Sequence, residues 1–127
     1  MTKQLKRILA FGFILAISFA SVARAETLAA AEKQKIEALI KQVGLLKEAQ
    51  FVRNGSTYNA DNAATFLRRK WQANASEVST ALDFIEKVAS ISGTSGKPYL
   101  IRFKDGKEIR SRDFLLGELR KLTHSQE

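Results

Sequence analysis

The side chains best suited to chemistry lie in the segment Gly93-Thr94-Ser95-Gly96-Lys97. A phosphate-binding loop needs Gly-x-x-x-x-Gly-Lys followed by Ser or Thr. Ile91 stands at the first glycine position and Pro98 at the hydroxyl position, so that pattern is incomplete. The Ser-x-x-Lys pattern of acyl enzymes is also incomplete, because its hydroxyl is Thr94 and its companion motifs are missing. We interpret the segment as a solvated connector whose backbone amides and Lys97 could bind an anion.

A second candidate is the basic run Arg68-Arg69-Lys70. On a helix, Arg69 lies opposite the apolar stripe, and the other two cations flank that stripe. Such a run is usually a solvated helix face. If it has a partner, we expect an anionic surface, with Arg53 and Lys97 converging on the same side of the molecule.

Residues for acid–base, nucleophilic or metal chemistry are scarce. The only histidine, His124, lies four residues from the end, whereas a catalytic base or metal ligand must be held in place. The absence of cysteine excludes disulfides, thiolate metal sites and the lipid-bearing cysteine of a lipoprotein. We therefore expect no catalytic residue, no metal and no other cofactor.

The first 25 residues are typical of a secretory signal. Three cations precede an apolar run over residues 8–20, and Ala23-Arg24-Ala25 provides the small residues of a cleavage site. The run is shorter than the about 20 residues that a membrane span needs. We predict cleavage after Ala25, which leaves residues 26–127 as one exported domain that does not span the membrane.

Cleavage also halves the basicity of the chain. The full sequence has a formal net charge of +8, and the predicted signal removes four cations and no acidic residue, which leaves +4. This value is ordinary for a small domain and far from the dense basic stripe of a nucleic-acid binder. We expect no nucleic-acid partner.

Apolar periodicity predicts four amphipathic helices. The third is expected to begin at an Asn74/Glu77 capping box. It is expected to bury one face made of Val78, Ala81, Leu82, Ile85, Val88 and Ala89. Asn59 or Asp61 is expected to cap the second helix. The predicted helices cover residues 27 to 44 or 48, 60–71, 74–89 and 111–122.

Two short hairpins are predicted between the helices. Asn54-Gly55 supplies the two positive-φ positions of a type I′ turn between strands 51–53 and 56–58. Asp105-Gly106 is expected to join strands 99–103 and 107–110. Tyr99 ends a strand, and we expect its hydroxyl in water. The sequence leaves open whether the two hairpins form one sheet.

These elements predict a mainly α fold with a small β component. About four short helices surround one core, with one or two very short hairpins attached. No linker or repeat indicates a second domain within residues 26–127.

Four sequence blocks resemble the YfeK-like family of small exported proteins of Gram-negative bacteria. In order, they are Phe51-Val52-Arg53-Asn54-Gly55, residues 63–70, residues 81–85 and residues 92–101. The resemblance extends from about residue 36 to residue 119 and implies a periplasmic location and one compact domain. It implies no activity.

The resemblance also concerns two positions that many family members fill with cysteine. Here these positions hold Ala49 and Phe103. If the family pair is a disulfide, this chain has replaced it with apolar packing, and Ala49 and Phe103 should lie close together.

The favoured hypothesis is a non-enzymatic, monomeric binding domain of the cell envelope with a protein or polymer partner. One alternative is electrostatic binding to an anionic envelope polymer or lipid head groups; a weaker one is a hydrolase that uses Ser92, Thr94 or Ser95 with Lys97. The candidate binding residues are Arg53, Asn54, Arg68, Arg69, Lys97 and Tyr99.

Overall fold

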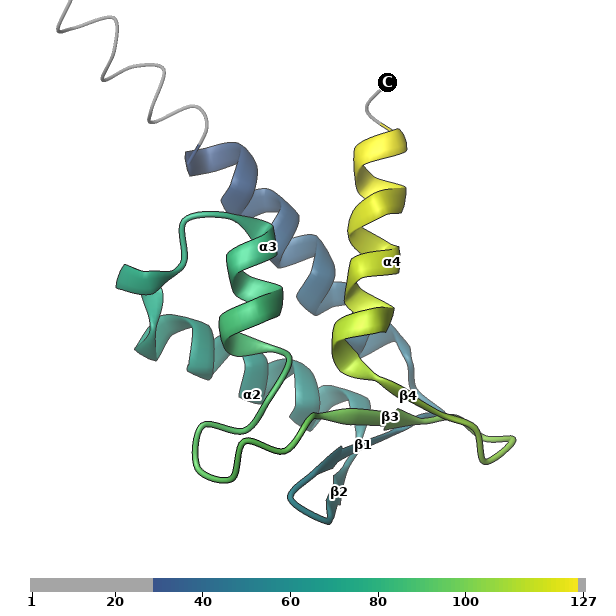
Figure 1. Ribbon diagram of the computed structural model, residues 1–127. Helices are drawn as coiled ribbons and strands as arrows, with labels where there is room; N and C mark the ends of the chain where they lie inside the picture. The colour runs from purple at the N-terminus through teal and green to yellow at the C-terminus, as the bar shows by residue number, and fades with distance from the viewer. Residues whose placement is uncertain (1–28, 126–127) are drawn as a thin grey trace, which may run out of the picture. The chain divides into compact units, whose positions relative to one another are not determined.

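The computed structural model describes residues 29–125 (Figure 1). The predicted signal peptide and its cleavage site lie outside these residues. The fold and the site described below belong to the compact unit that begins at residue 32. Its first helix reaches residue 45 and is followed by β1 (Gln50–Arg53), β2 (Ser56–Tyr58), α2 (Ala60–Ala73), η1 (Ala75–Glu77), α3 (Ala81–Asp83), η2 (Phe84–Val88), β3 (Leu100–Arg102), β4 (Glu108–Arg110) and α4 (Ser111–His124).

The two predicted hairpins form one antiparallel sheet with the strand order β2-β1-β3-β4. The central strands β1 and β3 pair in the register Gln50↔Arg102 and Phe51↔Ile101. Helices account for most of the described secondary structure, so the predicted mainly α fold with a small β component is confirmed.

The β1–β2 turn has the predicted local geometry. Asn54 has a φ of 51° and Gly55 a φ of 80°, which are the two positive-φ positions of a type I′ turn. Asn59 caps α2, since its side chain accepts a 2.8 Å hydrogen bond from the Asn62 N–H. Both features therefore depend on residues within three positions of each other in the sequence.

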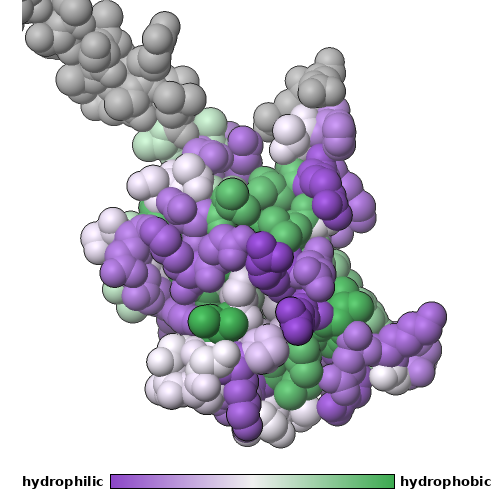
Figure 2. Space-filling model, in the orientation of Figure 1, coloured by the Kyte–Doolittle hydropathy of each residue, from purple (hydrophilic) through white to green (hydrophobic). Residues whose placement is uncertain are grey.

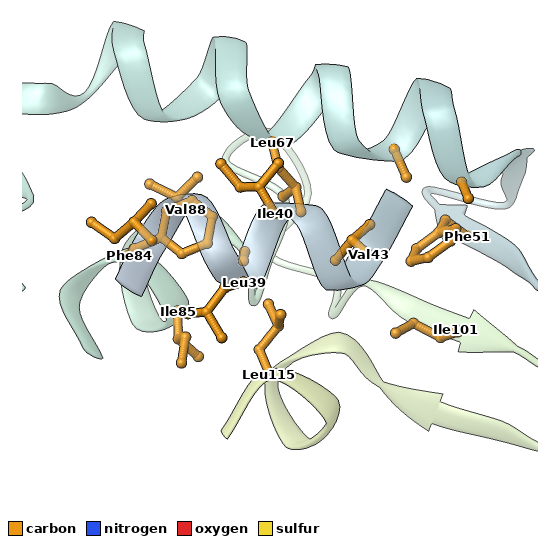
Figure 3. Packing of buried hydrophobic residues seen from close by; sticks show 14 of the residues in the cluster. Leu39, Ile40, Val43, Phe51, Leu67, Phe84, Ile85, Val88, Ile101 and Leu115 are labelled. Carbon is orange, nitrogen blue, oxygen red and sulfur yellow. The ribbon is translucent and has the colours of Figure 1, made fainter. Parts of the chain in front are cut away.

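The first helix lies at the centre of the hydrophobic core. Figure 3 shows Leu39, Ile40 and Val43 of this helix among side chains from the sheet and the other helices. All three are at most 1% exposed. The core residues that surround them are Phe51, Leu67, Phe84, Ile85, Val88, Ile101 and Leu115. Within residues 29–125, no helix has both the length and the apolar character to cross a membrane.

The predicted start of the third helix is wrong, and its predicted buried face is wrong at Leu82, whereas Ala81, Ile85, Val88 and Ala89 are buried as expected. Asn74 ends α2 instead, and the capping box is formed by Thr80 and Asp83, so the helix begins at Ala81. The next five residues form a π turn, in which the Ala89 N–H donates to the Phe84 carbonyl. Phe84 lies on the same buried face as Ala81, three residues earlier, whereas Leu82 is 50% exposed.

Asp83 makes the stability of this helix start sensitive to pH. Hydrogen bonding from the Ser79 N–H, with smaller contributions from Lys87 and Thr80, lowers the pKa of Asp83 below its ordinary 3.8, against opposing desolvation. Because the folded pKa is the lower one, this contribution is present above the unfolded pKa and is lost as the pH falls through the folded pKa.

We therefore expect the melting temperature of the wild type to fall more steeply between about pH 5 and about pH 3 than that of Asp83→Asn, which lacks the titrating group. Circular dichroism melts across this range measure the difference. Identical acid dependence of the two proteins would contradict the assignment.

The register of the central strands also places Ala49 opposite Phe103. In this antiparallel register Gln50 is opposite Arg102. One step further along the two strands, Ala49 is therefore opposite Phe103. In antiparallel pairs such neighbours have Cα atoms about 4.5–5.5 Å apart. Ala49 is buried and Phe103 packs against the core, so the proximity that the family resemblance implied follows from the strand pairing.

Candidate anion-binding site

The candidate site begins as a row of side chains across one end of the sheet. Continuing the β1–β3 register places Arg53 opposite Tyr99. On the other side of Tyr99, its carbonyl accepts a hydrogen bond from the Ser111 N–H at 2.9 Å, where α4 begins. Because side chains alternate along a strand, Arg53 and Tyr99 share the face of Phe51 and Ile101, which is the face that the helices cover.

Helix α2 places two further side chains over this row. The guanidinium of Arg53 lies over the Phe66 ring, with its carbon 4.6 Å from the ring centroid. The same ring meets Tyr99 edge to face at a centroid distance of 5.8 Å. One turn further along α2, the Lys70 ammonium donates to the Tyr99 hydroxyl at 2.8 Å and to the Ile91 carbonyl at 2.9 Å. We refer to Arg53, Phe66, Lys70 and Tyr99 as the basic–aromatic site.

The two cations of the site influence each other. Burial, and then the positive charge of Arg53, lowers the pKa of Lys70 from its ordinary value. Burial raises the pKa of Tyr99, and the charge of Arg53 opposes that rise. Among the seven ion pairs formed within residues 29–125, none includes Arg53 or Lys70. The site thus holds two neighbouring positive charges without a carboxylate partner from the described part of the chain.

A small apolar cavity opens beside these charges. Its volume is about 40 Å³, and Arg53 and Tyr99 form part of its lining. The remaining wall is mainly hydrocarbon, with contributions from Phe51, Ala63, Phe66 and Leu67. A cationic group and an apolar hollow therefore lie at the same place, between α2 and the sheet.

Asn54 holds the neighbouring loop against the sheet. Its amide donates to Ser92 Oγ at 3.2 Å, and its carbonyl oxygen accepts from Ser95 Oγ. Ser92 is only 3% exposed and also bonds to Thr94 Oγ1 at 3.0 Å. Within the loop, the Ser92 N–H donates to the Lys97 carbonyl. The hydroxyls that the sequence offered as nucleophiles thus hold the loop in place.

The structure separates the remaining sequence-predicted residues. Arg68 turns away from the site and donates to both carboxylate oxygens of Glu37 in the first helix, at 2.6 and 2.7 Å. Arg69 is exposed, and Lys97 is exposed in the loop. Of the six candidate residues, Arg53, Asn54 and Tyr99 meet in one region, and the cation that α2 contributes there is Lys70.

From the sequence alone, Lys70 is expected only to flank the apolar stripe as part of the basic run. Tyr99 was expected to keep its hydroxyl in water, which is wrong, since it is 7% exposed and bonded to Lys70. A signal was available: Phe66 and Lys70 are four residues apart, so they lie on one face of α2. What the sequence could not supply was the position of that face against Tyr99, which lies 29 residues further along the chain.

No three His, Cys, Asp or Glu side chains within residues 29–125 lie close enough to hold an ion. Figure 2 shows one face of the molecule, on which hydrophilic residues surround separate hydrophobic areas.

Comparison with known proteins supports the resemblance seen in the sequence. Over 68 residues the chain is 40% identical to a protein of Salmonella typhimurium (strain LT2) called uncharacterized protein YfeK. The aligned stretch covers 54% of this chain and 57% of that protein, so it spans little more than half of either. No solved structure matches the chain. A sequence profile of the DUF5329 family, described as a family of unknown function, matches residues 30–123, and the chain therefore belongs to this YfeK-like family.

Proposed function

We propose that the protein is a non-enzymatic binding domain of the bacterial cell envelope, and that its basic–aromatic site accepts an anionic group of the partner. The observation that carries the proposal is the pair of neighbouring cations, Arg53 and Lys70, without a carboxylate among their described contacts. Bringing an anion to this pair would relieve the repulsion between them and add charge-assisted hydrogen bonds.

The hydrogen bonds of the 92–97 loop support a binding role over hydrolysis. A serine nucleophile needs an adjacent base within hydrogen-bond reach. Ser92 Oγ instead interacts with Asn54 and Thr94, and Ser95 Oγ donates to Asn54. The loop is rich in hydroxyl groups because these groups bind it to Asn54 of the β1–β2 turn.

The proposed compartment is the periplasm. Its support is the sequence pattern of the first 25 residues, with cations, an apolar run and Ala23-Arg24-Ala25. Edman sequencing of protein recovered from cells should then begin near Glu26. A mature chain that begins at Met1 would contradict this part of the proposal.

Two variants at neighbouring positions, Lys70→Met and Arg69→Met, each remove one positive charge and together test the site. In ¹H–¹⁵N NMR spectra of protein purified from cells that express the full chain, acetate or phosphate should shift the backbone signals of Arg53, Lys70 and Tyr99. Lys70→Met should weaken the apparent affinity about tenfold or more, because it removes a charged hydrogen-bond donor. Arg69→Met is the matched control: it removes the same charge from an exposed neighbour and should leave the affinity unchanged.

Two results would contradict the proposal. One is the absence of any anion-dependent shift at the site in the wild type. The other is an equal loss of affinity in Lys70→Met and Arg69→Met, which would indicate attraction by net charge alone.

A further inference from the structure

The apolar cavity limits which anions can use the whole site. Arg53 and Tyr99 belong to the charged region and also line the cavity. Lys70 does not line it but donates to the Tyr99 hydroxyl. Phe51, Phe66 and Leu67 give the cavity a hydrocarbon wall. An apolar wall of this kind favours apolar groups over polar ones.

The hydrogen-bond donors that remain at the site suit a small planar anion. Phe66 covers one face of the Arg53 guanidinium, which leaves N–H groups at its planar edge for a two-point contact with a carboxylate. The Lys70 ammonium uses two of its three hydrogens on Ile91 and Tyr99. The Tyr99 oxygen accepts from Lys70, so its own hydroxyl hydrogen can still be donated.

The cavity volume sets the size of the attached group. A single water needs roughly 10–15 Å³ measured in the same way, and this cavity has about 40 Å³. It therefore has room for a short alkyl group rather than a ring system. A bare phosphate or sulfate would leave this apolar space unfilled and gain nothing from it.

We propose that the preferred ligand is a carboxylate whose neighbouring carbon has a short alkyl group, with the carboxylate on Arg53, Lys70 and Tyr99 and the alkyl group in the cavity. Two sources share this chemistry: a free short-chain carboxylic acid, and the carboxyl end of a peptide with a small apolar last residue. The inference rests on the proposed function, since it names the class of anion that the same site takes.

A chain-length series tests the inference on protein purified from cells that express the full chain. Dissociation constants are measured by NMR titration for acetate, propionate, butyrate and octanoate, with phosphate for comparison. Each methylene group that enters the cavity should tighten binding about fourfold. The gain should begin with propionate and stop once the cavity is full, so octanoate should gain little over butyrate.

A variant that fills the cavity supplies the matched control. Ala63 is buried, lines the cavity and lies on α2, and Ala63→Val places two more methyl groups there. The variant should bind acetate like the wild type but lose the gain from propionate and butyrate. Its melting curve and the unchanged acetate affinity show that the fold is intact. If Ala63→Val does not fold, Lys70→Met is measured in the same series. It should weaken the binding of every carboxylate by one common factor, while the affinity still increases from acetate to butyrate.

A peptide arm distinguishes the two sources. N-acetyl-Ala-Ala with a free carboxyl end is compared with its carboxamide and with propionate. Tighter binding of the free-acid peptide than of propionate identifies a peptide end, and equal binding identifies a free acid. In either case the carboxamide should bind at least tenfold more weakly than the free-acid peptide.

The failures are distinguishable. Equal affinities for acetate, butyrate and phosphate, all lost in Lys70→Met, would overturn the carboxylate inference and leave the anion site in place. No binding of any of these anions would overturn the proposed function as well.

Discussion

Phe84→Ala should lower the free energy of unfolding by about 3–5 kcal/mol. The Phe84 side chain is fully buried in the core cluster and meets Trp71 edge to face at a centroid distance of 6.1 Å. Its removal takes away buried apolar surface and leaves a cavity that the surrounding helices can fill only in part. For a domain of about 100 residues, this loss lowers the melting temperature by roughly 12 °C or more.

Leu82→Ala is the control for this prediction, because Leu82 precedes Phe84 by two residues in the same helical segment. Leu82 is 50% exposed, so its truncation should cost less than about 1 kcal/mol, as at other partly exposed positions. Urea unfolding of the two variants measures the difference. A larger loss for Leu82→Ala than for Phe84→Ala would contradict the burial of Phe84 and place Leu82 on the buried face, as periodicity predicted.

The second large effect is expected from a disulfide between positions 49 and 103. In the double variant Ala49→Cys/Phe103→Cys, oxidation should stabilise the protein by about 2–4 kcal/mol, because the bridge closes a long loop in the unfolded chain. The geometry favours the bond, since the β1–β3 register makes these residues cross-strand neighbours. Comparing the oxidised and reduced forms of the same variant cancels the packing lost with the Phe103 ring.

A second double variant, Gln50→Cys/Phe103→Cys, serves as the control. Position 50 is offset by one residue from the partner of Phe103, so its side chain lies on the opposite face of the sheet. We expect thiol titration to show two free cysteines in this variant under air and none in the first. Two free thiols in both variants would mean that the register is different.

Several features of the fold could be predicted from the sequence because they depend on residues a few positions apart. The Asn54-Gly55 turn follows from the tolerance of these two residues for positive φ. The start of α2 depends on a bond from Asn62 to Asn59, three residues away. Strong periodicity also predicted the last helix, which runs from Ser111 to His124.

The third helix shows where local reasoning ends. Asn74/Glu77 and Thr80/Asp83 are both plausible capping boxes by sequence. The structure uses the Thr80/Asp83 box. After the π turn ends, Ser90 Oγ donates a hydrogen bond to the Ile85 carbonyl. A period of 3.6 residues cannot anticipate a turn in which Ala89 bonds back to Phe84. The prediction also placed Leu82 inside, although it is 50% exposed.

The sequence by itself determined the Asn54-Gly55 turn, the Asn59 cap of α2 and which residues are apolar, since these depend on chemistry within about four positions. Only the tertiary structure decided that β1 pairs with β3 and that Lys70 of α2 reaches Tyr99. The same arrangement divides the basic run, with Arg68 bonded to Glu37 on one side and Lys70 to Tyr99 on the other. The physical reason is that contacts between distant segments depend on how all the apolar faces pack around the first helix, which no single stretch of sequence specifies.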